Sequence, residues 1–262
     1  MSTDDAQRTQ EPRTTISEKR KRFRAMHDNG FFVLPNPWDV GSAKRLERLG
    51  FSALASTSSG LAWSLGLEDQ HVGLEQVLDH LSTLAAATDL PLNADFEHGF
   101  ARTPEAVATN VRMAAATGVA GLSIEDFRDG ALYGERLAAE RIRAARAALD
   151  EVDENIVLVG RCEILLTDPA AIDVAVTRLI AYAEAGADCL YAPGVAEPRH
   201  IARIVEAVAP KPVNVLLWGE SMRPQQLAEL GVRRMSVGGK LARAAWEAFD
   251  AAASALARSL RE

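Results

Sequence analysis

Cysteine is scarce in this sequence: its 262 residues include only Cys162 and Cys189. A disulfide framework and a zinc-finger spacing of cysteines are therefore excluded, and a reducing, cytoplasmic setting is expected. Apolar runs of about 18 residues are also absent, and the segment after the first methionine has no apolar stretch like that of a secretory signal. We therefore expect no membrane span and no membrane partner.

Net positive charge is lacking as well, because 29 Lys and Arg residues face 36 Asp and Glu residues, a net charge of -7. This balance disfavours nucleic acid as a partner. The exception is the basic segment from Glu18 to His27, which we interpret as the solvated face of a helix rather than a nucleic-acid patch. Thr15 and Glu18 have the spacing of a capping box at its start. Residues 1–14 are polar and predict a disordered tail, and residues 15–262 predict one domain.

Short apolar runs alternate with helix-like stretches along the rest of the chain. The eight runs are Phe31–Pro35, Phe51–Ser56, Pro91–Asp95, Ala120–Glu125, Ile156–Arg161, Asp188–Ala192, Val213–Trp218 and Arg234–Gly238. They are nearly continuous in apolar residues, which is typical of strands buried on both faces of a parallel sheet. Thr103-Pro104 and Asp168-Pro169 have the pattern of a cap residue before a first-turn proline, and so predict two helix starts.

Eight such units predict an α/β fold of the TIM type, a (β/α)8 barrel. The alternative is an open, doubly wound sheet, which usually has a glycine-rich phosphate loop after its first strand. Here the first strand is followed by Asn36-Pro37-Trp38-Asp39, which is no such loop. The barrel is therefore favoured.

Active sites of such barrels lie at the carboxyl ends of the strands. The polar residues expected there are Ser56, Thr57, Ser58, Asp95, Glu97, His98, Glu125, Asp126, Arg161 and Glu163. Several converging carboxylates need a compensating cation, and oxygen ligands suit Mg²⁺ or Mn²⁺. Arg161 offers a fork for a substrate carboxylate or phosphate. A single Asp in a loop is more often solvated or capping, and this interpretation stays open for Asp126.

Four segments together resemble the isocitrate lyase/phosphoenolpyruvate mutase superfamily. They read ASTSSGLAWSLGLEDQ at 55–70, NADFEHGF at 93–100, GLSIED at 121–126 and VGRCE at 159–163. The resemblance extends from about Phe31 to Gly239, nearly the whole predicted barrel. No single motif is specific, but their order and spacing are.

The resemblance implies a role for each matching residue. Asp95 would bind Mg²⁺ directly, and Asp69, Glu97 and Glu125 would hold its water ligands. Arg161 would grip the substrate carboxylate and stabilise negative charge on a metal-bound, enolpyruvate-like intermediate. The expected catalytic residues are Arg161, Glu125 and His98, and the expected substrate-binding residues are Ser56, Thr57, Ser58, Arg161, Asn214 and Trp218. For His98, a capping or supporting role is the alternative.

The chain also departs from the superfamily pattern. Isocitrate and methylisocitrate lyases carry a Lys-Lys-Cys-Gly-His motif after the fourth strand, whereas residues 127–145 here contain no Cys and no His. Cys162 follows Arg161 and predicts a buried structural thiol instead. Leu216 and Leu217 replace a polar pair of the tricarboxylate-cleaving members. The mutase's phosphoryl-gripping loop is missing too. Tyr133, Glu135 and Arg136 could close over the substrate or simply begin a helix.

These features predict a Mg²⁺-dependent carbon–carbon lyase that acts on a small 2-oxo or 2-hydroxy dicarboxylate, for example by oxaloacetate decarboxylation or C–C cleavage. One alternative is P–C bond chemistry, as in a phosphonopyruvate hydrolase or mutase. Another is a non-catalytic barrel that binds a keto acid. The resemblance also implies a homo-oligomer, dimer or tetramer, in which the helical stretch Leu241–Leu260 packs on a neighbouring subunit.

Overall fold

The structure is a computed structural model that describes residues 13–217 and 223–260. Eight parallel strands form a nearly closed barrel in the order β1-β10-β9-β8-β7-β4-β3-β2. At the seam the Ala55 amide donates to the Pro35 carbonyl at 3.1 Å. The strands are β1 (Phe32–Leu34), β2 (Leu54–Ala55), β3 (Leu92–Asp95), β4 (Gly121–Glu125), β7 (Val157–Arg161), β8 (Cys189–Tyr191), β9 (Val213–Leu216) and β10 (Arg234–Ser236). The predicted (β/α)8 fold is confirmed.

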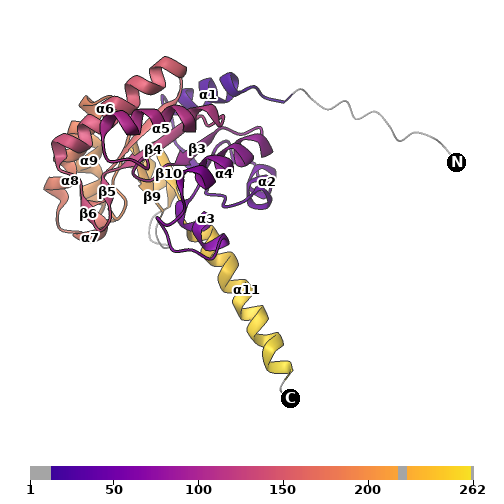
Figure 1. Cartoon of the computed structure of the whole chain (residues 1–262). Coiled ribbons are helices and arrows are strands. Elements are labelled where there is room, and N and C mark those ends of the chain that lie inside the picture. Colours follow the sequence, from indigo (N-terminus) through magenta and orange to yellow (C-terminus); the bar gives the residue numbers. More distant parts are fainter. Residues whose placement is uncertain (1–12, 218–222, 261–262) are drawn as a thin grey trace.

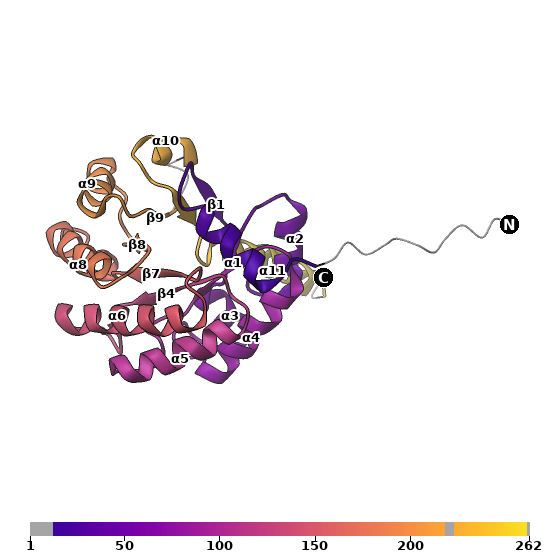
Figure 2. The same ribbon diagram turned by 90° about the horizontal axis from the view of Figure 1, so that it is seen from above.

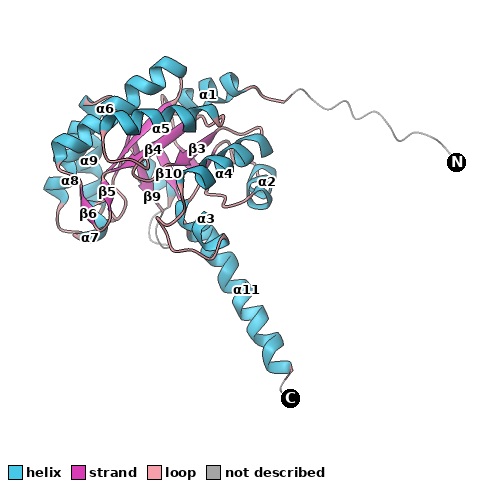
Figure 3. Cartoon of the chain, in the orientation of Figure 1, coloured by secondary structure: helices cyan, strands magenta, loops and turns pink. Residues whose placement is uncertain are grey.

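Helices surround these strands, as Figures 2 and 3 show. They are α1 (Ile16–Ala25), α2 (Val40–Arg48), α3 (Ser58–Ser64), α4 (Leu74–Ala87), α5 (Pro104–Ala116), α6 (Glu135–Val152), α7 (Ile164–Thr167), α8 (Ile172–Glu184), α9 (Pro198–Val208), α10 (Pro224–Glu229) and α11 (Lys240–Ser259). Alternate residues of a strand face opposite sides of the sheet, so the core has two parts. Val213 and Val215 belong to the part shared with the helices, and Val159 and Tyr191 belong to the part inside the barrel.

Helix α1 lies against the amino-terminal end of the barrel, and only some of its basic residues are solvated: Lys21 and Arg22 are exposed. Lys19 and Arg20 are buried. Lys19 Nζ donates to the carbonyls of Ala85 and Thr88, and Arg20 Nη2 donates to the carbonyl of Ala115 at 2.7 Å. The predicted solvated face therefore holds for Lys21 and Arg22 but was wrong for Lys19 and Arg20, because these two cations satisfy the carbonyl groups left open where α4 and α5 end.

Two of the three helix starts predicted from capping patterns are confirmed. Thr15 forms a capping box with Glu18, and Thr103 caps α5 with Pro104 in the first turn. The start predicted at Asp168 was wrong, because α8 begins at Ile172. Asp168 instead follows the short helix α7, and its carboxylate accepts the Ala170 amide at 3.0 Å. Asp168 thus forms a turn in which its side chain binds a backbone N–H two residues later, in place of capping a helix.

Residues 127–132 form an antiparallel hairpin, β5 (Phe127–Arg128) and β6 (Ala131–Leu132), that the sequence analysis did not predict. Glu135 and Arg136 begin α6, and Arg136 is exposed and paired with Glu140. Tyr133 packs under the guanidinium of Arg141, 4.0 Å from its ring centre. Glu135 and Arg136 therefore start a helix, whereas Tyr133 lies just before its cap residue.

Helix α11 projects away from the barrel, as Figure 1 shows. Ala242 is its only buried residue within the described range. Its aromatic residues Trp246 and Phe249 are 39% and 60% exposed. In the part of the chain that the structure describes, no helix is both long enough and apolar enough to cross a membrane.

Candidate active site

A cavity of about 440 Å³ lies at the carboxyl ends of the barrel strands. Residues from α3, the loop before α4, the strand ends and the start of α11 line it: Thr57, Ser58, Ser59, Trp63, Asp69, Asp95, Arg161, Leu166, Tyr191, Pro193, Leu216, Gly238, Gly239, Lys240 and Arg243. Its volume is in the range of small-molecule sites. The structure therefore brings Asp69, Asp95, Arg161 and the Thr57-Ser58 pair together, as the sequence analysis expected.

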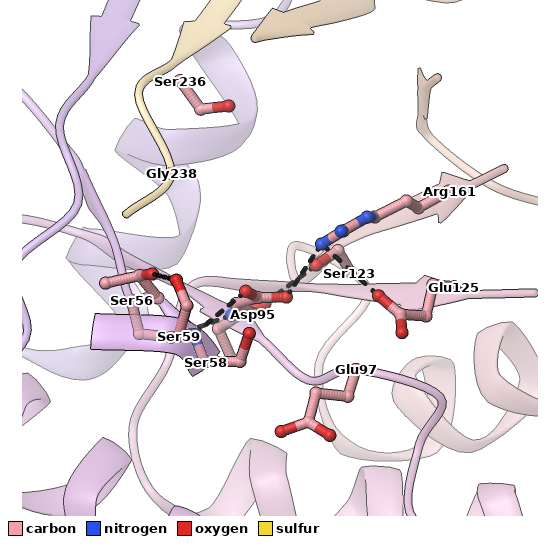
Figure 4. Close-up of polar contacts among 12 residues, drawn as sticks. Ser56, Ser58, Ser59, Asp95, Glu97, Ser123, Glu125, Arg161, Ser236 and Gly238 are labelled. Atoms are coloured by element: carbon pink, nitrogen blue, oxygen red, sulfur yellow. Dashed lines mark hydrogen bonds and ion pairs between the residues drawn. The ribbon is translucent and has the colours of Figure 1, made fainter. Parts of the chain in front are cut away.

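Arg161 connects the carboxylates of three neighbouring strand ends. Its Nη1 lies 3.2 Å from Asp95 Oδ1 and 3.4 Å from Glu125 Oε2. Its Nε and Nη2 donate to the two carboxylate oxygens of Glu163. Figure 4 shows the guanidinium between Asp95 and Glu125. These acids raise the pKa of Arg161 against the opposing effect of burial, so the guanidinium stays charged.

Asp95 is held from the loop after β2. Ser56 Oγ accepts the Asp95 amide at 2.8 Å, and the Ser58 amide donates to Asp95 Oδ2 at 3.1 Å. Thr57 caps α3, because its hydroxyl accepts the Gly60 amide. Ser56 is thus a positioning residue that does not line the cavity, whereas Thr57 and Ser58 do.

Glu97 is buried and strained. Its φ of 44° lies in the left-handed region, which is rare and costly for a residue with a side chain. Its Oε2 accepts no hydrogen bond from any described residue, and His98 Nδ1 is 3.9 Å away. Burial, and then the negative charges of Asp95 and Asp69, raise the pKa of Glu97 to about 8. Such strained, unpaired groups persist mainly at functional sites.

The other acids of the site show the same excess of negative charge. Burial raises the pKa of Glu125 despite the contact with Arg161. Asp69 lies at the exposed edge of the cavity, but the surrounding chain partly desolvates its carboxyl. This desolvation, and then the negative charge of Asp95, raise the pKa of Asp69. One arginine therefore leaves the carboxylates incompletely compensated.

These residues fit a hard divalent cation. The orphaned Glu97 oxygen and the uncompensated charge are what such an ion would satisfy. No three His, Cys, Asp or Glu side chains within residues 13–217 and 223–260 are arranged to ligate one ion directly. The donor set therefore suits one direct ligand with further carboxylates acting through water, a pattern common for Mg²⁺.

Three residues that support the site were given no role in it by the sequence analysis. Glu163 binds Arg161 from the same strand end, and the Arg-x-Glu spacing was the available signal. Gln70 donates to Glu125 Oε1 at 2.9 Å. It ends the 55–70 motif, but the sequence analysis gave it no role of its own. Asp126 is buried rather than solvated. It accepts the Glu163 amide at 2.9 Å and so orients the loop after β7.

Five of the expected residues that the structure describes do not line the cavity: Ser56, Glu97, His98, Glu125 and Asn214. Ser56 and Glu125 contact Asp95 and Arg161, which do line it. His98 lines a separate cavity of about 190 Å³ beside Gln70 and Arg128. Burial and nearby arginines lower its pKa to about 4, so it is uncharged near neutral pH. Asn214 lies inside the barrel, where its amide binds Ser236 and Arg234. Trp218 lies outside the described residues.

Both thiols are buried, as expected of structural cysteines. Burial raises the pKa of Cys162 well above the ordinary range and that of Cys189 to about 11. Neither residue lines the cavity. The site therefore lacks a thiolate nucleophile or a thiol acid among the described residues.

The segment 23–257 matches the model of the phosphoenolpyruvate phosphomutase family. The chain belongs to this family, within the PEP mutase/isocitrate lyase superfamily. The resemblance seen in its motifs is thereby confirmed.

Three similar proteins illustrate this membership. A solved structure from Burkholderia cenocepacia J2315, provisionally called a lyase/mutase, is 43% identical with a TM-score of 0.90, and the match covers 93% of this chain and 90% of that one. The structure of a 2,3-dimethylmalate lyase is 26% identical with a TM-score of 0.84 and coverages of 94% and 89%. The oxaloacetate decarboxylase of Pseudomonas savastanoi pv. phaseolicola is 28% identical over 235 residues, 85% of this chain and 79% of its own length.

Proposed function

We propose that the protein is a Mg²⁺-dependent carbon–carbon lyase that acts on a small 2-oxo or 2-hydroxy dicarboxylate, with oxaloacetate as the first substrate to test. The observation that carries the proposal is the charged Arg161, held among Asp95, Glu125 and Glu163 at the floor of a cavity. The similarity to an oxaloacetate decarboxylase and to a dimethylmalate lyase supports the same class of reaction.

The bound cation would supply a Lewis acid for the 2-oxo group, with Asp95 as its ligand and Asp69, Glu97 and Glu125 around its waters. In oxaloacetate decarboxylation the C3–C4 bond breaks, CO₂ leaves, and negative charge develops on the C2 oxygen. A proton from solvent then adds to C3 to give pyruvate. Arg161 stabilises that charge, because its position is fixed by Glu163 before substrate binds. Thr57 and Ser58 offer hydroxyls to the C1 carboxylate.

Proton NMR of oxaloacetate with purified protein and Mg²⁺ tests this proposal. We expect pyruvate to form at least about 10²-fold faster than with the Asp95→Asn variant, which keeps the shape of the side chain but loses its charge. The variant also corrects for decarboxylation by free metal. Asp173→Asn, a change at an exposed acid far from the cavity, is the matched control and should retain full activity.

The other outcomes are informative. Oxalate with acetate would replace the decarboxylase with a hydrolase that uses the same site. Turnover of phosphonopyruvate in place of oxaloacetate would favour the P–C chemistry for which the family is named. Metal and keto-acid binding without turnover of any of these acids would contradict the lyase and favour the binding barrel.

We also propose that α11 packs on a neighbouring subunit of a homo-oligomer. Trp246 and Phe249 are stacked edge to face on the projecting helix, and Leu256 beyond them is 66% exposed. Apolar side chains gathered on one element in this way mark an interaction surface. Analytical ultracentrifugation should find a dimer or tetramer for the natural protein. The Phe249→Glu variant should sediment as a monomer at the same concentration, whereas an unchanged oligomer would contradict this role of α11.

A further inference from the structure

The loop between β3 and α5 has an unusual backbone. The φ angles of Glu97, Gly99 and Phe100 are 44°, 69° and 54°, so three of four consecutive residues are left-handed. Glycine adopts this conformation readily, but at Glu97 and Phe100 it costs free energy because both have a side chain. Such strain persists only where the surrounding structure holds it. Contacts from other elements must therefore fix the loop of residues 97–102.

Arg141, on α6, supplies three of these contacts. Its Nη1 donates to the carbonyl of Ala101 at 2.6 Å and to that of Arg102 at 2.9 Å, and its Nη2 donates to the carbonyl of His98. The side chain is fully buried. Hydrogen bonds from a buried charged donor are stronger than those between neutral groups, so this one side chain can hold a strained loop.

The guanidinium of Arg141 is itself fixed. The ring of Tyr133 lies against it, with the ring centre 4.0 Å from Cζ. A planar guanidinium can stack on a ring while its nitrogens donate in different directions, which an ammonium group cannot do. The remaining carbonyl within this part of the loop, that of Gly99, accepts a hydrogen bond from Asn110 Nδ2 at 2.9 Å. Arg141 therefore provides most of the side-chain support of the loop among the described residues.

Glu97 directly precedes the supported segment. Its carbonyl accepts the Glu125 amide at 2.9 Å, and the next carbonyl, that of His98, is bound by Arg141. Figure 4 shows the Glu97 carboxyl below those of Asp95 and Glu125. Because φ sets the direction of the side chain relative to the preceding strand, relaxation of Glu97 to a negative φ would turn its carboxyl away from Asp95.

We infer that Arg141 is a positioning residue for the metal site: by holding residues 98–102, it keeps the Glu97 carboxyl in place around the water ligands of the cation. The inference rests on the proposed function, because it concerns the cation of the same site. Arg141 does not line the active-site cavity, so it acts on the cation through Glu97. Residues that support a metal site indirectly typically change its affinity about 10–100-fold.

Titration with Mn²⁺ alone, followed by the EPR signal of the free ion, tests the inference without substrate or turnover. We expect Arg141→Met to weaken Mn²⁺ binding about tenfold. Arg141→Lys keeps the charge but has a single nitrogen, which cannot bind the carbonyls of His98 and Ala101 as the two ends of a guanidinium do. Its affinity for Mn²⁺ should lie between those of Arg141→Met and the natural protein.

Arg20→Met is the matched control. Arg20 is also buried and also donates to backbone carbonyls, those of Ala115 and Val119, but at the amino-terminal end of the barrel. Its replacement should lower stability in the same way and leave the affinity for Mn²⁺ unchanged. Urea denaturation shows that each variant is folded under the conditions of the titration. Arg141→Lys keeps the buried charge and so remains decisive if Arg141→Met fails to fold.

Three outcomes would count against specific statements. If a folded Arg141→Met or Arg141→Lys protein binds Mn²⁺ as tightly as the natural protein, the inference is overturned while the proposed function stands. If Arg20→Met weakens binding as much as Arg141→Met, the effect reflects general destabilisation and the inference is overturned as well. If Asp95→Asn binds Mn²⁺ as tightly as the natural protein, the cation does not occupy this site, and the metal role in the proposed function fails together with the inference.

Discussion

Replacement of Arg161 by glutamine is expected to lower kcat/KM for oxaloacetate about 10³-fold, mainly through kcat. Arg161 is the only cation in contact with Asp95, Glu125 and Glu163 among the described residues. Its loss removes the group that stabilises negative charge on the C2 oxygen. It also leaves the buried Glu125 and Glu163 and the partly buried Asp95 without their cationic partner, which disfavours the charged state of the site. Steady-state kinetics by NMR or by a coupled pyruvate assay measures the change.

Two further variants separate chemistry from folding. Arg161→Lys keeps the charge but loses the fork that binds Glu163 through two nitrogens, and we expect it to recover only part of the activity. Arg24 lies on α1, away from the cavity, and pairs with Asp188. Arg24→Gln should therefore leave kcat unchanged. An Arg161→Gln protein that folds and keeps more than a tenth of the activity would contradict the assigned role.

The barrel was predictable because its strands are short, apolar and evenly spaced. Each run from Phe31 to Gly238 contains one of the eight barrel strands, although some strands are shorter than predicted. Strands buried on both faces are mostly apolar on both, and the few polar exceptions, such as Asn214 and Arg234, pair with each other. The apolar pattern therefore remains visible in the sequence. Parallel strands all have their carboxyl ends at one side of the barrel, so Asp95, Glu125 and Arg161, each at a strand end, were expected to lie together.

The direction of a side chain beyond a strand end was not predictable in the same way. Glu97 and His98 are neighbours, yet the left-handed backbone at Glu97 turns His98 into a separate cavity. Nothing in the sequence marks that turn, because glycine, the usual residue for it, comes only at Gly99. Asn214 was expected to bind substrate, but it faces the inside of the barrel two residues before the end of β9 and so lies deeper than the cavity.

The burial of some charged residues was also not predictable from the sequence. Lys19 and Arg20 look like surface residues in a sequence, since long cations are almost never fully buried without partners. Their partners are carbonyl groups of helices that lie about 66 and 95 residues away in the chain. Asp126 is the same case, because its partners come from α8 and from the loop after β7. Such pairings follow from the tertiary fold and leave no local pattern.

Asp126→Ala is expected to lower the free energy of unfolding by about 3–5 kcal/mol. The Asp126 carboxylate is 2% exposed and accepts from three donors: Arg178 Nη1 at 3.0 Å, the Tyr182 hydroxyl at 2.5 Å and the Glu163 amide at 2.9 Å. Removing it leaves the Arg178 guanidinium buried without its counter-ion, and this penalty exceeds the modest net value of the hydrogen bonds themselves. Urea denaturation followed by circular dichroism measures the loss.

A double-mutant cycle distinguishes this mechanism from simple loss of packing. Arg178→Met alone leaves the Asp126 charge buried, so we expect it to be destabilising as well. In the double variant Asp126→Ala/Arg178→Met no unpaired charge remains, and its loss should be smaller than the sum of the single losses by at least about 1 kcal/mol. Losses that add to within about 0.5 kcal/mol would show that the two side chains act independently. Because Asp126 also holds the Glu163 amide, the single variant should lose activity as well as stability, whereas Arg178→Met should lose chiefly stability.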